Sequence, residues 1–349
     1  MQLQKIDPAL TDQRKADHIR INLEEDVSFN QLTTGLEKYF FMHQALPELD
    51  LDQIDTRTTI FGRQLSTPLL ISSMTGGTAR ATSINRTLAE AAQEVGMAIG
   101  LGSQRAAIED EELAKSYRIR KYAPDIPIFA NIGAAQLNHG YGAEKLQVAI
   151  DMCEADAIYL HLNPLQEAVQ PEGDRDWSNL LSKIEHLCNV LPVPVMAKEV
   201  GSGISKEMAQ KLIDAGISAI DVAGAGGTSW SQVEMYRAEN WRDRRIAGTF
   251  RNWGIPTANS IQYCRQASAD LPVFASGGIK DGIDIAKCIA LGANLAGLAG
   301  QFLKSAVEGG SDATIELADT ITEELKIAMF CAGAGDLEAL SNTQLHTEF

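Results

Sequence analysis

The sequence of 349 residues contains only five cysteines, fewer basic than acidic residues, and no long apolar run. The cysteines lie far apart and form no C-x-x-C pair, which argues against a disulfide framework or a zinc site. The longest uncharged segment, 126–143, contains proline, asparagine and histidine, so we expect no membrane span. The charged N-terminal residues contain no signal-peptide apolar region, and we therefore expect a cytoplasmic protein with reduced thiols.

Basic residues are scarce relative to acidic ones. The chain has 30 Lys and Arg against 46 Asp and Glu, a formal net charge of −16. Affinity for nucleic acid comes mainly from basic side chains that neutralise phosphates, so we expect no nucleic-acid partner. A small anionic substrate is still possible if the basic residues gather locally. The composition, 45% hydrophobic and 22% charged, is typical of a globular α/β protein.

Short apolar runs alternate with segments of helical period from about residue 67 onward. Continuous apolar runs bounded by Gly and Pro are typical of strands buried on both faces of a parallel sheet. The eight runs are 68–73, 97–102, 126–133, 157–163, 193–200, 218–224, 271–278 and 294–300. Helical periods occur at 82–95, 111–122, 143–153, 205–215 and 282–291. This order predicts an α/β fold of the TIM (β/α)₈ barrel class.

The alternative is an open, doubly wound sheet, but no first strand here is followed by G-x-G-x-x-G. Two segments depart from the barrel repeat. Residues 1–66 form an N-terminal extension before the barrel of 67–349, and residues 229–256 form a long insertion after the sixth strand. The insertion contains Trp230, Trp241, Trp253 and a basic cluster at 242–245. We expect either an active-site lid or a subunit contact there.

Polar residues follow most of the predicted strands. They include Ser73 to Thr75, Ser103 to Arg105, Asn131, and the series His161, Asn163, Gln166 and Glu167. Chemistry in this fold occurs at the carboxyl ends of the strands, so the pattern favours an enzyme. The last two strands end in S-G-G-I (276–279) and Ala299-Gly300, where backbone N–H groups can bind a phosphate.

Lys198 ends the apolar strand V-P-V-M-A-K and should project into the barrel mouth. It could form a Schiff base, bind a substrate phosphate, or lie beside the pyrimidine edge of a flavin. The structural alternative is an ion pair with a carboxylate such as Glu199. Glu167 is a candidate Mg²⁺ ligand, and Gln166 can orient a substrate or relay a proton only through hydrogen bonds.

The ordered motifs resemble the type 2 isopentenyl-diphosphate:dimethylallyl-diphosphate isomerases, a family of FMN-dependent (β/α)₈ enzymes. The resemblance covers nearly the whole chain, from R-K-A-D-H-I at 14–19 to the glycine at 300. Each motif is weak alone, and their ordered combination is specific. The motifs between these ends are S-M-T-G-G (73–77), G-S-Q-R (102–105), H-L-N-P-L-Q-E (161–167), A-K-E-V-G (197–201), G-G-T-S-W (226–230) and S-G-G-I (276–279).

The resemblance implies a set of site residues, matched motif by motif. The isoalloxazine and ribityl parts of FMN would contact Ser73, Met74, Thr75, Ser103, Asn131, Lys198 and Thr228. The FMN phosphate would contact Gly277, Gly278, Ile279, Lys280, Ala299 and Gly300. The substrate diphosphate would contact Arg14, Lys15, His18, Ser103, Gln104, Arg105 and Asn163, with Mg²⁺ at Glu167. The extension 1–66 would thus contribute to the substrate site, and Gln166 and His161 would lie near the isoprenoid carbons as catalytic residues.

The implied reaction interconverts isopentenyl diphosphate and dimethylallyl diphosphate by a 1,3-allylic shift of the double bond, without net redox change. In this family NADPH first reduces the flavin. We expect reduced FMN to act as acid and base with help from Gln166, because no Asp, Glu or Cys at the strand ends is placed for both proton transfers. The resemblance also implies a symmetric homo-oligomer such as a tetramer or octamer.

The sequence offers less support for three alternative functions. Among other FMN-dependent TIM-barrel oxidoreductases, an α-hydroxy-acid oxidase needs a His-Gly-Gly-Arg-type segment and an inosine-monophosphate dehydrogenase a nucleophilic Cys. Residues 221–230 contain no His, Arg or Cys. A Schiff-base aldolase that uses Lys198 is a different class of enzyme, and a flavin- or phosphate-binding protein without turnover is a non-enzymatic alternative.

Overall fold

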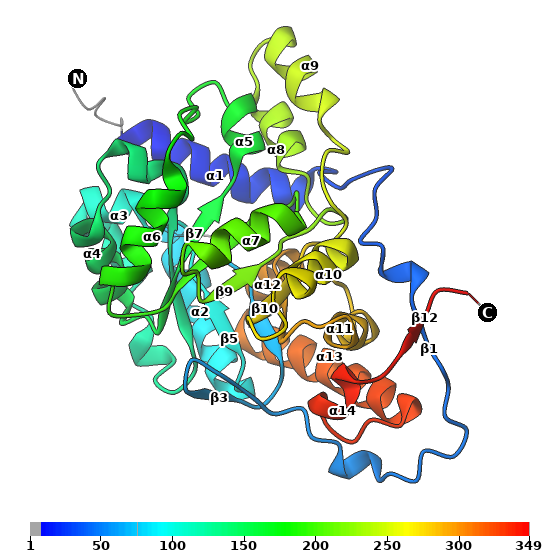
Figure 1. The fold of residues 1–349 in the computed structure, drawn as a ribbon. Coiled ribbons are helices and arrows are strands. Elements are labelled where there is room, and N and C mark those ends of the chain that lie inside the picture. The colour runs from blue at the N-terminus through cyan, green and yellow to red at the C-terminus, as the bar shows by residue number, and fades with distance from the viewer. Residues whose placement is uncertain (1–7, 75, 349) are drawn as a thin grey trace.

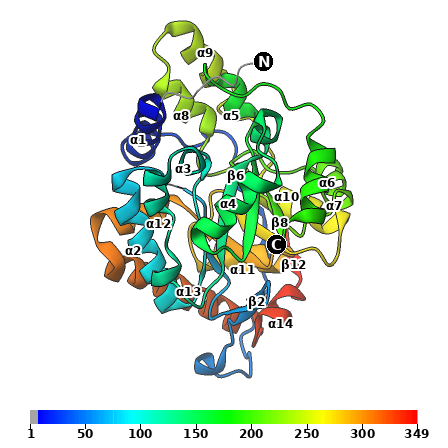
Figure 2. The ribbon, with the colours of Figure 1, turned by 90° about the vertical axis from the view of Figure 1, so that its left-hand side faces the viewer.

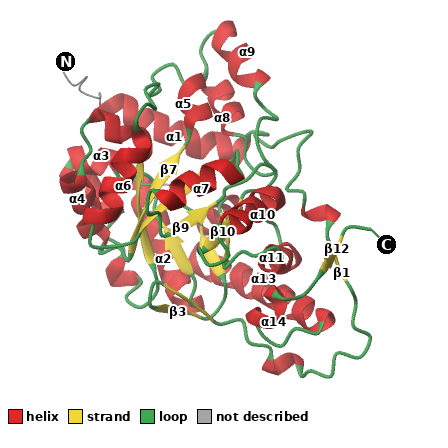
Figure 3. Cartoon of the chain, viewed as in Figure 1, coloured by secondary structure: helices red, strands yellow, loops and turns green. Residues whose placement is uncertain are grey.

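The computed structural model describes residues 8–74 and 76–348. Eight parallel strands close into a barrel in the order β10-β11-β4-β5-β6-β7-β8-β9, with helices around them (Figures 1 and 3). Closure confirms the (β/α)₈ prediction and excludes the open sheet. All eight predicted apolar runs contain a barrel strand. The strands are β4 (Leu69–Ile71), β5 (Ala98–Gly100), β6 (Ile128–Gly133), β7 (Ala157–Leu162), β8 (Val195–Glu199), β9 (Ala219–Asp221), β10 (Val273–Ser276) and β11 (Leu295–Leu298).

Amphipathic helices surround the barrel and bury their apolar faces against it. These outer helices are α2 (Ala79–Val95), α4 (Ala143–Cys153), α6 (Leu180–Val190), α7 (Lys206–Asp214), α10 (Thr257–Ala267), α11 (Gly282–Ala290) and α13 (Gly310–Ala332). Polar residues cap several of these helices. Ser205, for example, precedes α7, and its side chain accepts a hydrogen bond from the Met208 N–H. No helix in the described part of the chain is both long and apolar enough to cross a membrane.

The prediction of a helix over 111–122 is wrong. The structure has α3 (Arg105–Glu109) followed by two 3₁₀ turns, η3 (Glu111–Ser116) and η4 (Arg120–Tyr122). Side chains take the backbone groups that a continuous helix would use: Asn85 of α2 donates to the Ser116 carbonyl over 2.8 Å. The chain turns there so that Tyr117 becomes fully buried and donates to the Ser103 carbonyl.

Alternation along the strands divides the barrel interior into two layers. Successive residues of a strand point to opposite faces, so inward positions are two residues apart. The lower layer is apolar and includes Leu70, Ala98, Phe129, Ala157, Met196, Ala219, Phe274 and Leu295. Two residues further along several strands stand polar residues, namely Ser72, Asn131, Lys198, Asp221 and Ser276. The interior of the barrel therefore has an apolar layer at its centre and a polar layer above it, at the carboxyl ends of the strands.

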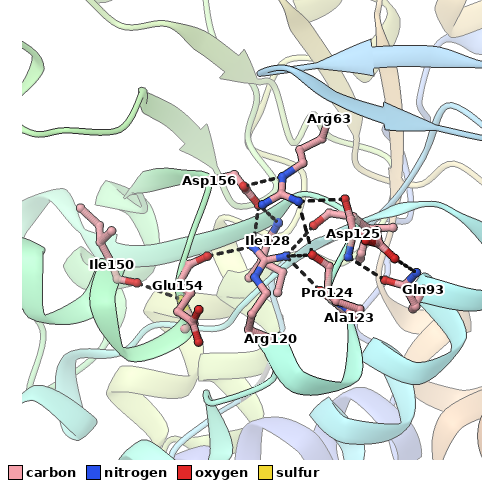
Figure 4. Close-up of polar contacts among 12 residues, drawn as sticks. Arg63, Gln93, Arg120, Ala123, Pro124, Asp125, Ile128, Ile150, Glu154 and Asp156 are labelled. Carbon is pink, nitrogen blue, oxygen red and sulfur yellow. Dashed lines mark hydrogen bonds and ion pairs between the residues drawn. The ribbon is translucent and has the colours of Figure 1, made fainter.

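A hairpin closes the opposite end of the barrel. Strands β2 (Thr58–Ile60) and β3 (Arg63–Leu65) place Ile60 and Leu65 in the interior apolar cluster. Arg63 reaches from this hairpin to Asp156, with Nε 2.8 Å from Oδ1, and Arg120 contacts the other carboxylate oxygen over 2.6 Å (Figure 4). Asp156 also accepts from the Ile128 N–H at the start of β6. These contacts join the hairpin to the barrel wall.

The remainder of the extension runs along the outside of the barrel to both ends. Helix α1 (Pro8–Glu24) lies at the carboxyl end beside α8 (Trp230–Arg237), with α9 (Trp241–Thr249) beyond them, while the β2–β3 hairpin lies at the other end (Figure 2). Ile21, Val27 and Val233 form a separate apolar cluster between these segments. The remaining elements are β1 (Phe40–Phe41), paired with β12 (Leu345–His346), then η1 (Leu36–Lys38), η2 (Leu51–Gln53), η5 (Ala134–His139), α5 (Pro164–Val169), α12 (Gly300–Glu308) and α14 (Leu337–Ser341).

Replacing Asp156 with alanine should destabilise the fold without changing the mouth of the barrel. Two guanidinium groups would lose their carboxylate partner and a backbone N–H its acceptor, which should lower the free energy of unfolding by about 3 kcal/mol. Urea unfolding measures the loss. The exposed Asp151→Ala variant on α4 is the control and should change stability by less than about 0.5 kcal/mol. Equal stability of the two variants would contradict the role of this ion-pair cluster.

Candidate active site

The carboxyl end of the barrel gathers most of the predicted site residues. His161 at the end of β7 lies with its Nδ1 2.7 Å from Asn131 Oδ1 of β6. The two residues lie on the adjacent strands β6 and β7, and the residue of β6 that is directly opposite His161 is Gly133. A methyl group at Gly133 would come within 2.9 Å of His161 Nε2, so the glycine leaves room for the ring.

Gln104 takes a different position from the one expected. Its side chain is fully buried, its Nε2 donates to the Ala149 carbonyl over 2.8 Å, and its Oε1 accepts from the Asn131 N–H over 2.9 Å. These bonds join the end of β5 to β6 and α4. The structure therefore gives the side chain of Gln104 a role inside the protein wall rather than in the mouth.

Asn163, Gln166 and Glu167 form one hydrogen-bonded group at the start of α5. Pro164 stands at the first turn of this helix, where its missing N–H costs nothing. Asn163 Nδ2 lies 3.0 Å from both Gln166 Oε1 and Glu167 Oε1. The second Glu167 oxygen accepts from the Asp174 N–H over 2.7 Å. Asn163 Oδ1 is buried without a hydrogen-bond partner among the described residues.

Glu234 of α8, absent from the sequence-based expectations, connects two of the expected residues. Its Oε1 lies 2.9 Å from Gln166 Nε2 and 3.1 Å from His18 Nε2, and its Oε2 contacts Arg237. Burial opposes ionisation of this carboxyl, but the hydrogen bond and charge of His18, with the charge of Arg237, lower its pKa to about 2. Since Asn163 donates to Oε1 of Gln166, the orientation of the Gln166 amide is determined from both sides.

Arg105 lies at the same mouth and is paired with Asp174. Its Nη1 is 3.1 Å from Asp174 Oδ2, and its Nε is buried without a hydrogen-bond partner in the described part of the chain. Asp174 also accepts from Gln136 Nε2 over 2.8 Å and lies 3.0 Å from His139 Nε2. The Asp174 loop thus supports both Arg105 and, through its backbone N–H, Glu167. Arg14 and Lys15 belong to α1, but their side chains lie outside the described residues.

Lys198 is paired with a carboxylate, as the structural alternative anticipated, but the partner is Asp221 rather than Glu199. Lys198 Nζ lies 2.8 Å from Asp221 Oδ2, and Ser276 Oγ donates to Asp221 Oδ1 over 2.5 Å. Glu199 instead accepts from three successive backbone N–H groups, those of Val200, Gly201 and Ser202, at 2.5–2.7 Å. Burial raises the pKa of Glu199 to about 7, although these donors favour its charged form.

The remaining predicted flavin contacts border the polar layer. Ser73 follows β4, and Ser72 Oγ and Ser73 Oγ are buried without hydrogen-bond partners within residues 8–74 and 76–348. Met74 is half-buried against the core, and Thr75 lies outside the described residues. Ser103 accepts from Tyr117 through its carbonyl, which leaves its hydroxyl for another partner. Thr228 Oγ1 lies 3.4 Å from Asn22 Oδ1 of α1.

The glycine ends of β10 and β11 lie where the sequence predicts a phosphate site. Gly277 and Gly278 have φ values of 103° and 79°, which favour glycine. A methyl group at Gly278 would come within 2.5 Å of Gly226, so the two glycine loops are packed backbone to backbone. Ala299 and Gly300 begin α12, and a methyl group at Gly300 would meet no atom within 4 Å. Ile279 is buried and Lys280 exposed beside them.

The residues at the mouth could hold an FMN. Two buried serine hydroxyls that lack partners among the described residues, an ammonium at the inner surface and glycine loops beside a helix N-terminus are groups able to bind a flavin mononucleotide. No group of three His, Cys, Asp or Glu residues able to hold a metal occurs in the described ranges. A cation at Glu167 would therefore depend on water and on phosphate oxygens of a ligand, as Mg²⁺ commonly does.

A narrow cleft joins these residues to the insertion. It is lined by Phe29, Asn163, Leu165, Gln166, Glu199, Val200, Gly201, Ser202, Ser229, Trp230 and Trp253. Its walls therefore come from the extension, from the ends of β7 and β8, and from the insertion 229–256. Trp253, which lines the cleft, is 62% exposed, and Trp241 of α9 is 75% exposed. The cleft gives an apolar wall beside the Gln166 amide.

The fold and this arrangement define a flavin-type barrel. The sequence profile of the FMN-dependent dehydrogenase family matches residues 9–124 and 144–347. Among solved structures, a lactate oxidase of Pediococcus acidilactici aligns with a TM-score of 0.71 over 99% of this chain and 96% of that chain. A mandelate oxidase variant aligns with a TM-score of 0.68 over 99% of this chain and 100% of that one. Identities of 17% and 18% support the common fold alone.

Closer relatives define the family more narrowly. The isopentenyl-diphosphate delta-isomerase of Nostoc sp. is 54% identical over 97% of this chain and 96% of its own length. The isopentenyl-diphosphate delta-isomerase of Rickettsia rickettsii is 50% identical over 97% of this chain and 98% of its own. The chain belongs to the FMN-dependent, type 2 family of isopentenyl-diphosphate delta-isomerases. This confirms the resemblance inferred from the motifs.

Glu234→Gln should change the acid dependence of stability. The pKa of Glu234 is lowered from 4.5 to about 2 on folding, so its contribution is present above pH 4.5 and is lost as the pH falls toward 2. The variant should be less stable than the unmodified chain by on the order of 3 kcal/mol above pH 4.5, and the difference should shrink below it. Urea unfolding at several pH values measures this.

The exposed Glu239→Gln variant, two residues beyond the end of the same helix, is the control and should not reproduce this change. A stability difference for Glu234→Gln that stays constant from pH 6 to pH 2.5 would show that the charge of Glu234 is not what stabilises the cluster.

Proposed function

We propose that this chain interconverts isopentenyl diphosphate and dimethylallyl diphosphate by a 1,3-allylic double-bond shift. The observation that carries the proposal is that Asn163, Gln166 and Glu167 share one mouth with Lys198, Arg105 and the glycine loops. The chain has this arrangement together with 54% identity to a named isopentenyl-diphosphate delta-isomerase. An alkene and a diphosphate need an apolar wall and a cationic group at one site. The cleft beside Gln166 offers the apolar wall, and Arg105, paired with Asp174, offers a cation.

The roles of the residues follow the family resemblance, and the chemistry of the side chains agrees with them. Arg105, with its fork of donors, and His18 are assigned to the diphosphate, together with Arg14 and Lys15 of α1. Ser73, Asn131, Lys198 and the glycine loops are assigned to FMN. Reduced FMN, when bound, would supply the acid and base for the carbon centres, with NADPH as the reductant. Gln166, held by Asn163 and Glu234, would position the reacting carbons and exchange hydrogen bonds during the proton transfers.

Glu167 would hold Mg²⁺ on the diphosphate. Its two oxygens and the Asn163 amide lie within one hydrogen-bonded group, and hard oxygen ligands are what Mg²⁺ prefers. His161 would border the isoprenoid part of the substrate, held by Asn131. We also propose that the chain assembles as a homo-oligomer, a tetramer or octamer.

The Schiff-base aldolase receives less support from this geometry. A nucleophilic lysine must be neutral to attack a carbonyl. Lys198 Nζ is instead engaged in an ion pair with the fully buried Asp221 carboxylate, 2.8 Å away. An ammonium held in this way suits an electron-rich or anionic ring edge.

The first test is a visible spectrum of the purified protein, followed by addition of NADPH and then of isopentenyl diphosphate with Mg²⁺. We expect an oxidised-flavin spectrum that bleaches with NADPH, and dimethylallyl diphosphate only in the reduced sample. A colourless protein that takes up no added FMN and forms no product would overturn the proposal. Trapping of a substrate adduct by borohydride would favour the aldolase.

Gln166→Ala should lower kcat at saturating substrate by about 10- to 100-fold, because a group that orients the proton transfer would be lost. The fold should persist, since the side chain of Gln166 forms its hydrogen bonds with Asn163 and Glu234 at the mouth and is not part of the apolar core. Gln210→Ala on the exposed face of α7 is the matched control and should retain full turnover. Unchanged kcat in Gln166→Ala would refute the assigned role.

Glu167→Gln should raise the Mg²⁺ concentration needed for half-maximal rate by about 10- to 100-fold, because an amide is a weaker ligand than a carboxylate. Titration of the rate with Mg²⁺ at fixed substrate measures the shift. Glu185→Gln on the exposed side of α6 serves as control. If both variants need the same Mg²⁺ concentration as the unmodified chain, Glu167 is not the metal ligand.

A further inference from the structure

Asp221 is a fully buried carboxylate inside the barrel. It is directly opposite Lys198 in the parallel register of β8 and β9, and the two charged groups are 2.8 Å apart. Its other oxygen accepts from Ser276 of β10 over 2.5 Å and from the Ala223 N–H over 3.3 Å. Three neighbouring strands therefore supply the ammonium, the carboxylate and the hydroxyl.

A buried ion pair is weak evidence of a stabilising purpose. Removal of two charges from water costs several kcal/mol, and apolar side chains of similar size often replace such pairs without loss of stability. The layer beneath this pair shows that the barrel packs well with apolar residues, for Met196, Ala219 and Phe274 occupy the inward positions two residues earlier on the same strands. Packing and stability alone therefore do not explain why an ion pair is present at these two positions.

The pair restrains a flexible side chain at the inner surface of the mouth. Lysine has a four-carbon stem with many rotamers, so its ammonium stays in place only through its contacts. Lys198 Nζ contacts Asp221, lies 3.3 Å from Ser276 Oγ and is 6.0 Å from the centre of the Tyr159 ring. Burial and the negative charge of Asp221 raise the pKa of the Tyr159 hydroxyl well above its ordinary value, so this ring stays neutral beside the ammonium.

We propose that Asp221 is a positioning residue that holds the Lys198 ammonium, through a direct ion pair supported by Ser276, where it meets the ring of bound FMN. This inference rests on the proposed function, since it assigns a flavin to the mouth. Asp221 itself lies below the mouth, with no exposed surface, and acts only through Lys198. Its removal should therefore matter only when Lys198 is present.

A double-mutant cycle on FMN affinity tests this dependence. Asp221→Asn and Lys198→Met are each expected to weaken binding of FMN to the apoprotein by about 10-fold or more, measured by quenching of flavin fluorescence. The double variant should bind no more weakly than Lys198→Met alone, because the carboxylate has no function without its partner. The exposed Asp214→Asn variant of α7 is the control and should bind FMN as the unmodified chain does.

Stability of the FMN-free protein supplies a second readout. Asp221→Asn leaves a buried ammonium without its counter-ion, whereas the double variant removes both charges, so the double variant should melt at a higher temperature than Asp221→Asn. If Asp221→Asn fails to fold, the double variant is still expected to fold and to match Lys198→Met in FMN affinity.

The outcomes separate this inference from the proposed function. Losses of affinity that multiply in the double variant, or normal FMN binding by Asp221→Asn, would overturn the positioning role while the flavin site stands. Failure of the unmodified chain to bind FMN at all would overturn the proposed function and this inference together. Non-multiplying losses combined with the higher melting temperature of the double variant would support the role.

Discussion

The two-residue alternation of side chains along eight closed parallel strands is the constraint on which the site depends. Because inward positions repeat every second residue, one strand can place an apolar side chain in the floor and a polar one in the mouth. Met196 and Lys198 of β8, or Phe274 and Ser276 of β10, are such pairs. The apolar floor excludes water from beneath, so the charges above it lie in a medium where their contacts are strong and their mispairing is costly.

Three basic side chains at the mouth, among the residues that the structure describes, are each held by an acidic partner of the protein. Lys198 is paired with Asp221, Arg105 with Asp174, and His18 with Glu234. A chain with a net charge of −16 repels free anions over most of its surface, so an anionic ligand must be bound by cations fixed at one place. The acidic partners keep these long side chains in defined positions. Low overall basic content and a cationic mouth are therefore compatible.

The strand ends could be predicted from sequence because their signal is local. An apolar run followed by S-M-T-G-G or H-L-N-P-L-Q-E shows both the strand and its polar end. In the structure Asn163, Gln166 and Glu167 share hydrogen bonds, and His161 precedes them on β7, bonded to Asn131. The carboxylates that hold the site could not be predicted in the same way. Asp221 lies within an apolar run, and Glu234 lies on a helix 68 residues beyond Gln166, and their pairings exist only after the chain has folded.

Local patterns also misled where tertiary contacts override them. Residues 111–122 have a helical period, yet Asn85 takes the Ser116 carbonyl and the helix does not form. Gln104 follows a strand, as a mouth residue should, but its amide bonds to backbone groups inside the wall. A signal for Asp221 was nevertheless present: an acidic residue in a β-strand whose neighbours are all apolar must have a partner, and Lys198 ends the preceding strand.

The extension and the insertion form one wall of the site, although more than 200 residues separate them. Asn252 Oδ1 accepts from the N–H groups of Gln31 and Asn30, and Arg251 contacts Asp26 over 2.7 Å. The Ser229 N–H donates to the Val27 carbonyl over 2.8 Å. These bonds use the inner side of the insertion, whereas Trp241 stays exposed on α9. The inner side of the insertion is therefore already bonded to the extension that carries His18, and its outer side, with Trp241, is the part left to contact another molecule.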